Sequence, residues 1–564
     1  MNVLQPSRLL SKELLTCESF DCYDDFGHGP FQRRLLLFRS LAFFLMNANS
    51  FVLHLITSDV GHWCKRPPHS NMSAASWITS AIPLESDGSL SRCLRNEHPD
   101  EPNNTNTIPC EEWEFEQELA STTIVSEWNL VCQRRSLIAV LILVHNGACA
   151  AFAIAAGSLA DNGGRLRVLM AAIITLVFST TATCLSDSYV VYASFKFFVW
   201  GSAAVTMALP AVALFEVTTH ENRPRHIVLA RTVGVVFSDL WYVGWTPVQL
   251  DWKLKQTVLV LSTLLLLPAL PYIEESPRWL TGQGRLRSAE DVMLSAAKSN
   301  IFPTSSTAWL HNKLKGDMST NAARLTTIQD LLHGLSIRQR ALVLCFSFFS
   351  ITLAAFAIFF SPLHRRSVWL HLPSFLTTLA VYAVMHVLIR RLTMLAVIRG
   401  WFMAIGALQC LLSLTVGAGF LLVSEVLLIL AKAFYYSGSV MCFVYAMELF
   451  PSAVRGTAVC WTFACGRLGA VVASVSLVLQ KVGREDAAFH FSGALLFASV
   501  FAMGRLPRET TVECAKTDAW RVPTVIRRHM DHMKQTLEGR PEEPGSPMSS
   551  HEGANSPGKL AIKS

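Results

Sequence analysis

Charged residues are scarce in this chain of 564 residues, since Asp, Glu, Lys and Arg together make up only 16% of it. Soluble chains average about a quarter charged residues, so this composition excludes an ordinary cytosolic enzyme, a disordered regulator and a coiled coil. The sequence also lacks the phosphate-binding pattern G-x-x-x-x-G-K-[ST], the metal spacing H-x-x-x-H and a supported Ser/His/Asp arrangement. We therefore expect no enzymatic activity, no ATP, no metal, no cofactor and no nucleic acid partner.

Hydrophobic residues, in contrast, make up 51% of the chain and come in long runs. A bilayer core about 30 Å thick requires roughly 20 apolar residues per helix. Two sets of six runs approach this length, and they predict an all-α membrane protein with twelve transmembrane helices in two six-helix bundles. The predicted spans cover residues 35–56, 137–159, 166–186, 189–215, 227–248, 256–273, 339–361, 368–389, 393–416, 420–446, 456–480 and 487–504.

The spans divide the chain into five predicted parts. Residues 1–34 form a cytoplasmic N-terminal segment, which we interpret as a leader rather than a cleaved signal peptide because acidic residues interrupt its apolar stretch. Residues 35–273 form the first bundle, and residues 339–505 form the second. Residues 274–338 form a cytoplasmic loop between the bundles, and residues 506–564 form a cytoplasmic tail that is largely disordered because it is rich in Pro, Gly, Ser and charge.

Basic residues in the short loops predict the orientation, because cytoplasmic loops are enriched in Lys and Arg. They follow the predicted spans two, four, eight and ten, which all end on one side of the membrane. We therefore expect a multi-pass protein of the plasma membrane with that side, and both termini, in the cytoplasm. The basic residues in these loops are Arg165, Arg167, Arg223, Arg225, Arg390, Arg391 and Arg455.

The polar segment 57–134, between spans one and two, is then a large extracellular loop. It contains four cysteines, and an oxidising compartment predicts two disulfides among them in any of three pairings. It also contains the sequons Asn71-Met72-Ser73 and Asn103-Asn104-Thr105, which predict glycosylation at Asn71 and Asn103. The four cysteines are Cys64, Cys93, Cys110 and Cys132.

A specific motif, G-x-L-A-D-x-x-G-R, follows the second span and contains Gly157, Asp161, Gly164 and Arg165. Its glycines permit a tight reversal between helices, and its two charges can pair with each other or with helix ends to form a cytoplasmic gate. The motif resembles the signature loop of the major facilitator superfamily. The segments Ser121–Cys132, Glu275–Leu280 and Glu448–Pro451, together with the large loop, resemble the organic cation/anion/carnitine transporter family within it.

This resemblance implies two bundles that rock around a central cavity and expose it alternately to each side of the membrane. One departure from the family lies after span eight, where Ile389-Arg390-Arg391-Leu392 lacks the expected Asp and Gly. The residues that the resemblance implies as bundle-closing contacts are Asp161, Arg165, Glu216, Arg223, Glu275, Arg278, Glu448 and Arg455.

Charges inside predicted spans are costly and usually face a cavity. We expect Arg467, which is flanked by glycines, and Lys432 to attract a carboxylate or sulfonate. Asp239 either pairs with Arg467 or binds the ammonium of a zwitterion. Aromatic side chains can add stacking or cation–π contacts. The predicted substrate-binding residues are Arg467, Lys432, Asp239, Tyr435, Phe359 and Phe360, whereas Arg39, Arg231 and Arg399 are expected to reach toward span ends.

The sequence thus predicts transport of small organic ions, with organic anions or carnitine-like zwitterions favoured. One alternative is an organic cation carrier in which Asp239 or Glu425 binds the ammonium. The other is a receptor or scaffold that has lost transport, which the altered loop after span eight suggests. The expected partners are the small organic ion and the lipid bilayer, and the sequence assigns no oligomeric state.

Overall fold

The computed structural model of the chain is mainly helical. The predicted glycosylation sites Asn71 and Asn103, residues 1–25 of the N-terminal segment and nearly all of the predicted tail lie outside the residues that it describes. The structure describes residues 26–57, 60–67, 73–85, 89–97, 106–115, 122–219, 222–248, 250–303, 310–315, 335–361, 371–450, 452, 454–475 and 485–506.

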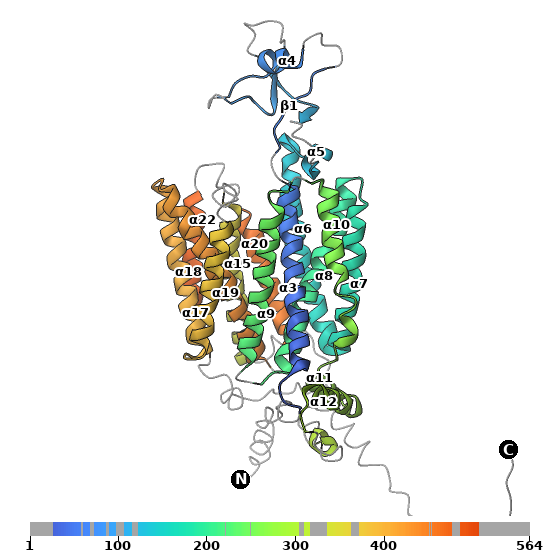
Figure 1. The fold of residues 1–564 in the computed structure, drawn as a ribbon. Coiled ribbons are helices and arrows are strands. Elements are labelled where there is room, and N and C mark those ends of the chain that lie inside the picture. The colour runs from blue at the N-terminus through green and yellow to red at the C-terminus, as the bar shows by residue number, and fades with distance from the viewer. Residues whose placement is uncertain are drawn as a thin grey trace, which may run out of the picture. The chain divides into compact units, whose positions relative to one another are not determined.

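The first half of the chain forms a group of helices packed on one another, which we call the N-terminal group (Figure 1). Helix α8 is its centre, since it contacts four of the other helices and most of its own side chains are buried. The group consists of α3 (Pro30–Ile56), α6 (Ser136–Gly163), α7 (Arg165–Cys184), α8 (Tyr189–Glu216), α9 (Arg223–Trp245) and α10 (Trp252–Leu264).

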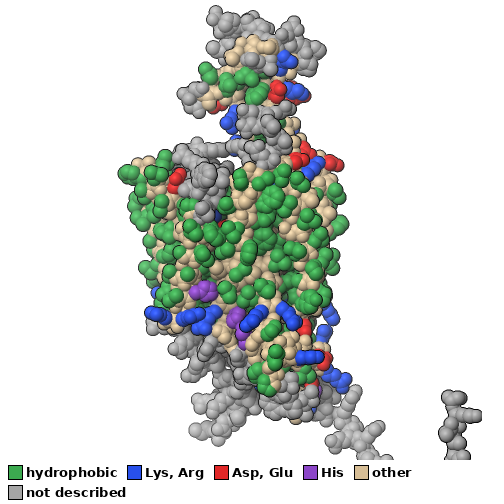
Figure 2. All heavy atoms as spheres, in the orientation of Figure 1, with side chains coloured by type: hydrophobic (Ala, Val, Ile, Leu, Met, Phe, Trp, Pro, Cys, Tyr) green, Lys and Arg blue, Asp and Glu red, His purple; other side chains and the backbone are tan. Residues whose placement is uncertain are grey.

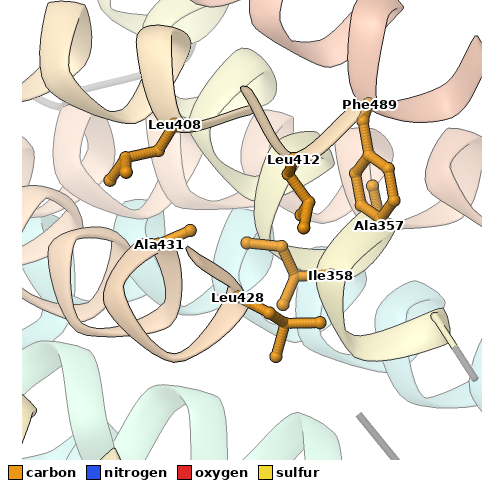
Figure 3. Close-up of a cluster of buried hydrophobic side chains, with 7 residues drawn as sticks. All are labelled: Ala357, Ile358, Leu408, Leu412, Leu428, Ala431 and Phe489. Carbon is orange, nitrogen blue, oxygen red and sulfur yellow. The ribbon is translucent and has the colours of Figure 1, made fainter. Parts of the chain in front are cut away.

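The second half forms the C-terminal group in the same way. Figure 3 shows part of its core, where side chains from four helices interdigitate: Ala357, Ile358, Leu408, Leu412, Leu428, Ala431 and Phe489. The two groups meet mainly where α6 contacts α20 and where α9 contacts α17 and α19. The C-terminal group consists of α15 (Leu335–Phe360), α17 (His371–Ile389), α18 (Met394–Gly417), α19 (Leu421–Leu449), α20 (Arg455–Ala473) and α22 (Glu485–Met503).

Each predicted span overlaps one of these helices, and the prediction of an all-α membrane fold is confirmed. Among the described residues, 10 helices are long and apolar enough to cross a membrane, and residues Pro373–Ile389 of α17 form a shorter apolar helix. The twelve-span count stays a prediction, because α10 has only 13 residues. The predicted sixth span reaches residue 273, but α10 ends at Leu264 because the ring of Pro268 would clash with the carbonyl four residues before it.

Short elements mark the two ends of the helical body (Figure 1). The end with α11 (Pro277–Gly282) and α12 (Leu286–Asn300) is called the lower end, and the end from which residues 60–135 extend is called the upper end. Consecutive long helices run alternately between the two ends. Figure 2 shows apolar side chains over the sides of this body, with Lys and Arg gathered along its lower margin.

The described parts of residues 60–135 contain short strands and helices. Strand β1 (His62–Cys64) pairs antiparallel with β4 (Trp113–Phe115), and β2 (Leu94–Asn96) pairs antiparallel with β3 (Thr107–Pro109). The helical elements of the segment are α4 (Ala74–Ala81), α5 (Ile124–Glu127) and the 3₁₀ turn η2 (Cys132–Arg135).

Two disulfides connect the parts of this segment. They join Cys64 to Cys110 and Cys93 to Cys132, which is one of the three pairings that the sequence left open. Cys64 and Cys110 are buried with Ile82 in a small apolar cluster, so the first disulfide lies at the centre of this core. Very small domains usually bury too little apolar surface to be stable without such a covalent bond.

Candidate functional site

A buried ionic cluster joins the two helix groups at the lower end. Glu216, at the end of α8, pairs with Arg165 of α7 and accepts a hydrogen bond from Nη1 of Arg455 at 2.8 Å. All three side chains are almost fully buried, so each charge depends on its partners for stabilisation. We call Asp161, Arg165, Glu216 and Arg455 the lower cluster.

Asp161 connects the groups through the backbone. Its carboxylate accepts hydrogen bonds from the N–H groups of Gly456 and Thr457, at 3.2 and 2.7 Å, and from the Thr457 hydroxyl at 2.9 Å. These N–H groups belong to the first turn of α20, and N–H groups in a first turn have no hydrogen-bond acceptor within their own helix. Asp161, on α6 of the N-terminal group, therefore caps a helix of the C-terminal group.

Glycines permit the close approach that this cap requires. A Cβ atom on Gly157 would lie 2.8 Å from Cβ of Cys460 and 3.0 Å from the carbonyl oxygen of Gly456, so α6 and α20 nearly touch there. Gly164 has a φ of +109°, a conformation that favours glycine, where the chain reverses between α6 and α7. Glu275 fixes the start of α7 because its Oε2 accepts a hydrogen bond from the N–H of Leu166 at 3.0 Å.

The remaining predicted bundle-closing residues lie at the same end. Arg223 donates from Nε to the carbonyl oxygen of Thr218 at 3.0 Å, which holds the turn between α8 and α9. Arg278 lies on α11, and Glu448 lies in the last turn of α19. The structure thus brings Asp161, Arg165, Glu216 and Arg455 into direct contact and places the other predicted residues around them.

A cavity lies between the two groups, above the lower cluster. It is lined by side chains from α3, α6, α8, α9, α15, α19 and α20. Its lining reaches the upper turns of α3 at His54 and of α15 at Phe360. Four predicted substrate-binding residues line it: Arg467, Tyr435, Phe359 and Phe360.

The glycines beside Arg467 determine how closely the neighbouring helix packs around it. A Cβ atom on Gly466 would lie 2.9 Å from Oγ1 of Thr352, and one on Gly469 would collide with the backbone of Phe349, so α15 packs tightly against α20. The predicted close approach of a neighbouring helix is confirmed. The guanidinium of Arg467 lies over the ring of Phe463, 4.5 Å from its centroid, at the wall of the cavity.

Asp239 and Lys432 lie outside the described lining of the cavity. Both are buried, and each is the charged neighbour of the other across the groups. Nζ of Lys432 also lies 5.8 Å from the ring centroid of Tyr436. Among the described residues no ion pair joins Asp239 to Arg467, so the structure gives no support to the internal pair weighed from the sequence.

Arg231 corrects a prediction. It was expected to reach toward a span end, but it is only 6% exposed, lines the cavity and donates from Nη2 to the hydroxyl of Ser439 at 2.7 Å. Its guanidinium also lies 4.4 Å from the ring centroid of Phe43. Arg39 is likewise fully buried and donates to the carbonyl oxygen of Met207, whereas Arg399 is exposed as expected.

Two histidines of the cavity escaped sequence reasoning. His145 stacks on Trp200 with centroids 4.7 Å apart, and His54 lies in the last turn of α3. The sequence could have indicated them, because each is a polar residue within or at the end of a predicted span. The described lining therefore includes two arginines and two histidines but no acidic side chain.

This combination of features defines a class of protein. Long apolar helices form two groups, a cationic cavity lies between them, and a buried ionic cluster closes one end. Such an arrangement is typical of a polytopic membrane transporter whose substrate site lies between two helix groups.

Comparison with known proteins agrees with this class. Residues 91–508 match the family of sugar (and other) transporters, so the chain belongs to that family. Solute carrier family 22 member 7 of Bos taurus is 27% identical, over 85% of this chain and 91% of that protein. The organic cation/carnitine transporter 2 of Homo sapiens is 26% identical, over 81% of this chain and 85% of that protein.

Solved structures show the same fold at low sequence identity. The major facilitator proton:xylose symporter XylE superposes with a TM-score of 0.60 at 14% identity, covering 86% of this chain and 98% of the symporter. The human organic anion transporter MFSD10 superposes with a TM-score of 0.51 at 14% identity, covering 84% of this chain and 100% of that protein. The predicted relationship to the organic ion and carnitine carriers of the major facilitator superfamily is confirmed, and the relatives are transporters rather than enzymes.

Proposed function

We propose that this protein carries small organic anions, or carnitine-like zwitterions, across the plasma membrane by alternating access. The observation that carries the proposal is the charge of the central cavity. The guanidinium groups of Arg467 and Arg231 lie among aromatic side chains, and the described lining contains no carboxylate. A guanidinium in a partly desolvated site binds a carboxylate or sulfonate with two parallel hydrogen bonds.

The aromatic side chains suit an anion attached to an apolar body. Phe359 packs edge to face against Tyr435 and Tyr436, with centroids 6.5 and 6.4 Å apart, and these rings line the cavity. Such walls bury the organic part of a ligand, while a few polar groups orient it. A substrate with an aromatic or aliphatic body and one acidic group fits this arrangement best.

The two alternatives find less support. Among the described acidic residues, neither Asp239 nor Glu425 lines the cavity, which disfavours a carrier of simple organic cations. A zwitterion remains within the proposal, since its carboxylate would contact Arg467. The scaffold alternative rests on the altered loop after span eight, but the contacts of the lower cluster are complete without that loop.

The lower cluster supports the proposed mechanism. In this conformation it holds the groups together at the lower end, while the cavity reaches toward the upper end. We place the lower end in the cytoplasm, which makes this the outward-facing state. Breaking the cluster and closing the upper end would then expose the cavity to the cytoplasm.

Uptake into proteoliposomes tests the substrate class. We expect accumulation of radiolabelled p-aminohippurate or carnitine well above empty vesicles, and no accumulation of tetraethylammonium, because the cavity presents guanidinium groups. Uptake of tetraethylammonium alone would indicate the cation carrier. No uptake of any of the three by correctly folded protein would favour the scaffold.

Glycosylation tests the proposed orientation. Replacing Asn71 and Asn103 with Gln should abolish the glycosidase-sensitive shift on gels, because the proposed topology places both sequons outside the cell. The single variants serve as controls and should each retain part of the shift if both sites are used. A shift that survives the double substitution would place the sugar, or the segment, elsewhere.

A further inference from the structure

Basic and imidazole side chains gather at the lower end of α9 and α17, outside the described lining of the cavity. Helix α9 carries Arg225 and His226, α17 carries His386, and Arg390 and Arg391 follow directly after α17. The two helices pack against each other although they belong to different groups. We call these five residues the basic rim.

Three members of the basic rim, Arg225, His386 and Arg390, lie close together. His386 and Arg390 are four residues apart and share one side of the chain at the end of α17. Arg225 and Arg390 are both electrostatic neighbours of His386. Figure 2 shows Lys, Arg and His side chains together along this margin, where the apolar surface ends.

Positive charge here lacks a counterion among the described residues. Nη1 of Arg225 donates to Oδ1 of Asn222 at 3.2 Å, but its Nε and Nε2 of His386 are buried and find no hydrogen-bond partner within the described structure. Beside the rim, His28 lies against His226, with ring centroids 4.7 Å apart. Burial, and after it the neighbouring His226 and Arg33, lowers the pKa of His28.

Apolar side chains continue directly from the rim along both helices. Leu229 lies one turn above Arg225 on α9 and is 42% exposed, and Leu379 lies two turns above His386 on α17 and is 44% exposed. A ligand with an acidic head group and hydrocarbon chains fits this arrangement, with the head at the basic rim and the chains along the apolar side chains above it. A free phosphate ion would use only the lower part of it.

We propose that the basic rim binds the anionic head group of a phospholipid whose acyl chains lie along α9 and α17. Basic pockets between membrane helices are suited to such head groups, and anionic lipids concentrate in the cytoplasmic leaflet. The proposal rests on the proposed placement of the lower end in the cytoplasm, but it does not depend on the proposed substrate. Because the rim takes residues from both groups, a bound head group would hold their lower ends together.

Native mass spectrometry of the full-length protein in mild detergent tests this site. We expect phosphatidylserine to remain bound about tenfold more than phosphatidylcholine, and Arg225→Gln with Arg390→Gln to lower its retention about tenfold. Arg34→Gln with Arg167→Gln removes two exposed cations from the lower ends of α3 and α7, and this matched control should retain the lipid as the wild type does.

Several outcomes would overturn the proposal. Equal loss of phosphatidylserine in the control would show that any basic residue of the lower margin suffices, and full retention in the rim variant would place the lipid elsewhere. Displacement by excess inorganic phosphate would identify a site for soluble anions. Arg390→Gln with Arg391→Gln changes only exposed side chains, so it repeats the test without the half-buried Arg225 if the first variant folds poorly.

Discussion

Arg467→Asp is expected to lower uptake of organic anions or carnitine by at least about tenfold. The guanidinium lies at the cavity wall over Phe463, in a partly desolvated site. A charge-assisted contact there is worth roughly 1.5–3 kcal/mol, and about 1.4 kcal/mol is one decade in affinity. Initial uptake rates over a range of substrate concentrations, normalised to surface-biotinylated protein, measure the effect.

Two variants make this result specific. Arg399→Asp introduces the same change of charge on an exposed position of α18 and should transport normally. Arg467→Asp combined with Asp239→Arg should not restore uptake, because Asp239 has Lys432 rather than Arg467 as its charged neighbour. Recovery of both surface expression and the original selectivity in the swapped variant would show that the two residues form an internal pair.

Asp161→Asn is expected to cut maximal uptake about tenfold while apparent affinity stays within a few-fold. The amide keeps the shape of the side chain but loses the charge that accepts hydrogen bonds from Gly456 and Thr457. Charged acceptors contribute roughly 1.5–3 kcal/mol per hydrogen bond, so the conformation closed at the lower end should lose population. Asp161 does not line the cavity in which we propose that the substrate binds.

Cys460 provides a direct readout of this change. It is fully buried beside Gly157 and should become reactive toward a maleimide when α6 and α20 separate. We expect faster modification of Cys460 in Asp161→Asn than in wild type, quantified by mass spectrometry of its peptide. Cys149, which is also fully buried but lies at Trp200 in the N-terminal group, should be unchanged. Reduced affinity with unchanged maximal uptake would contradict the proposed role of the lower cluster.

The sequence predicted the helices well because they leave a local signal, and it drew attention to part of the lower cluster through one motif, while Glu216 and Arg455 followed only from the family resemblance. Long apolar runs mark spans, and the glycines and charges near Asp161 stand at fixed spacings in one short motif. The cavity is different, because its lining comes from seven helices that are far apart in the sequence. Arg231 and His145 could be noticed as polar residues in apolar runs, but only the packing of α9 and α6 shows which side they face.

Partner assignments were the weakest part of the sequence reasoning. Asp239 and Arg467 are plausible partners by charge alone, yet their helices place them beside Lys432 and His145 respectively. The end of α10 shows a second limit, since the hydrophobic run continues past Leu264 while the prolines stop the helix. Hydrophobicity predicts where a chain enters a membrane, whereas proline and packing decide where a helix ends.

The cap that Asp161 provides for α20 has a consequence for the proposed opening of the lower end. The N–H groups of Gly456 and Thr457 have no acceptor within their own helix once the two groups separate, and an unpaired buried donor costs roughly 1–3 kcal/mol. Solvent must therefore replace the carboxylate as the groups part. Opening then requires water molecules to enter the contact between α6 and α20, where they replace the carboxylate as hydrogen-bond acceptors of these N–H groups.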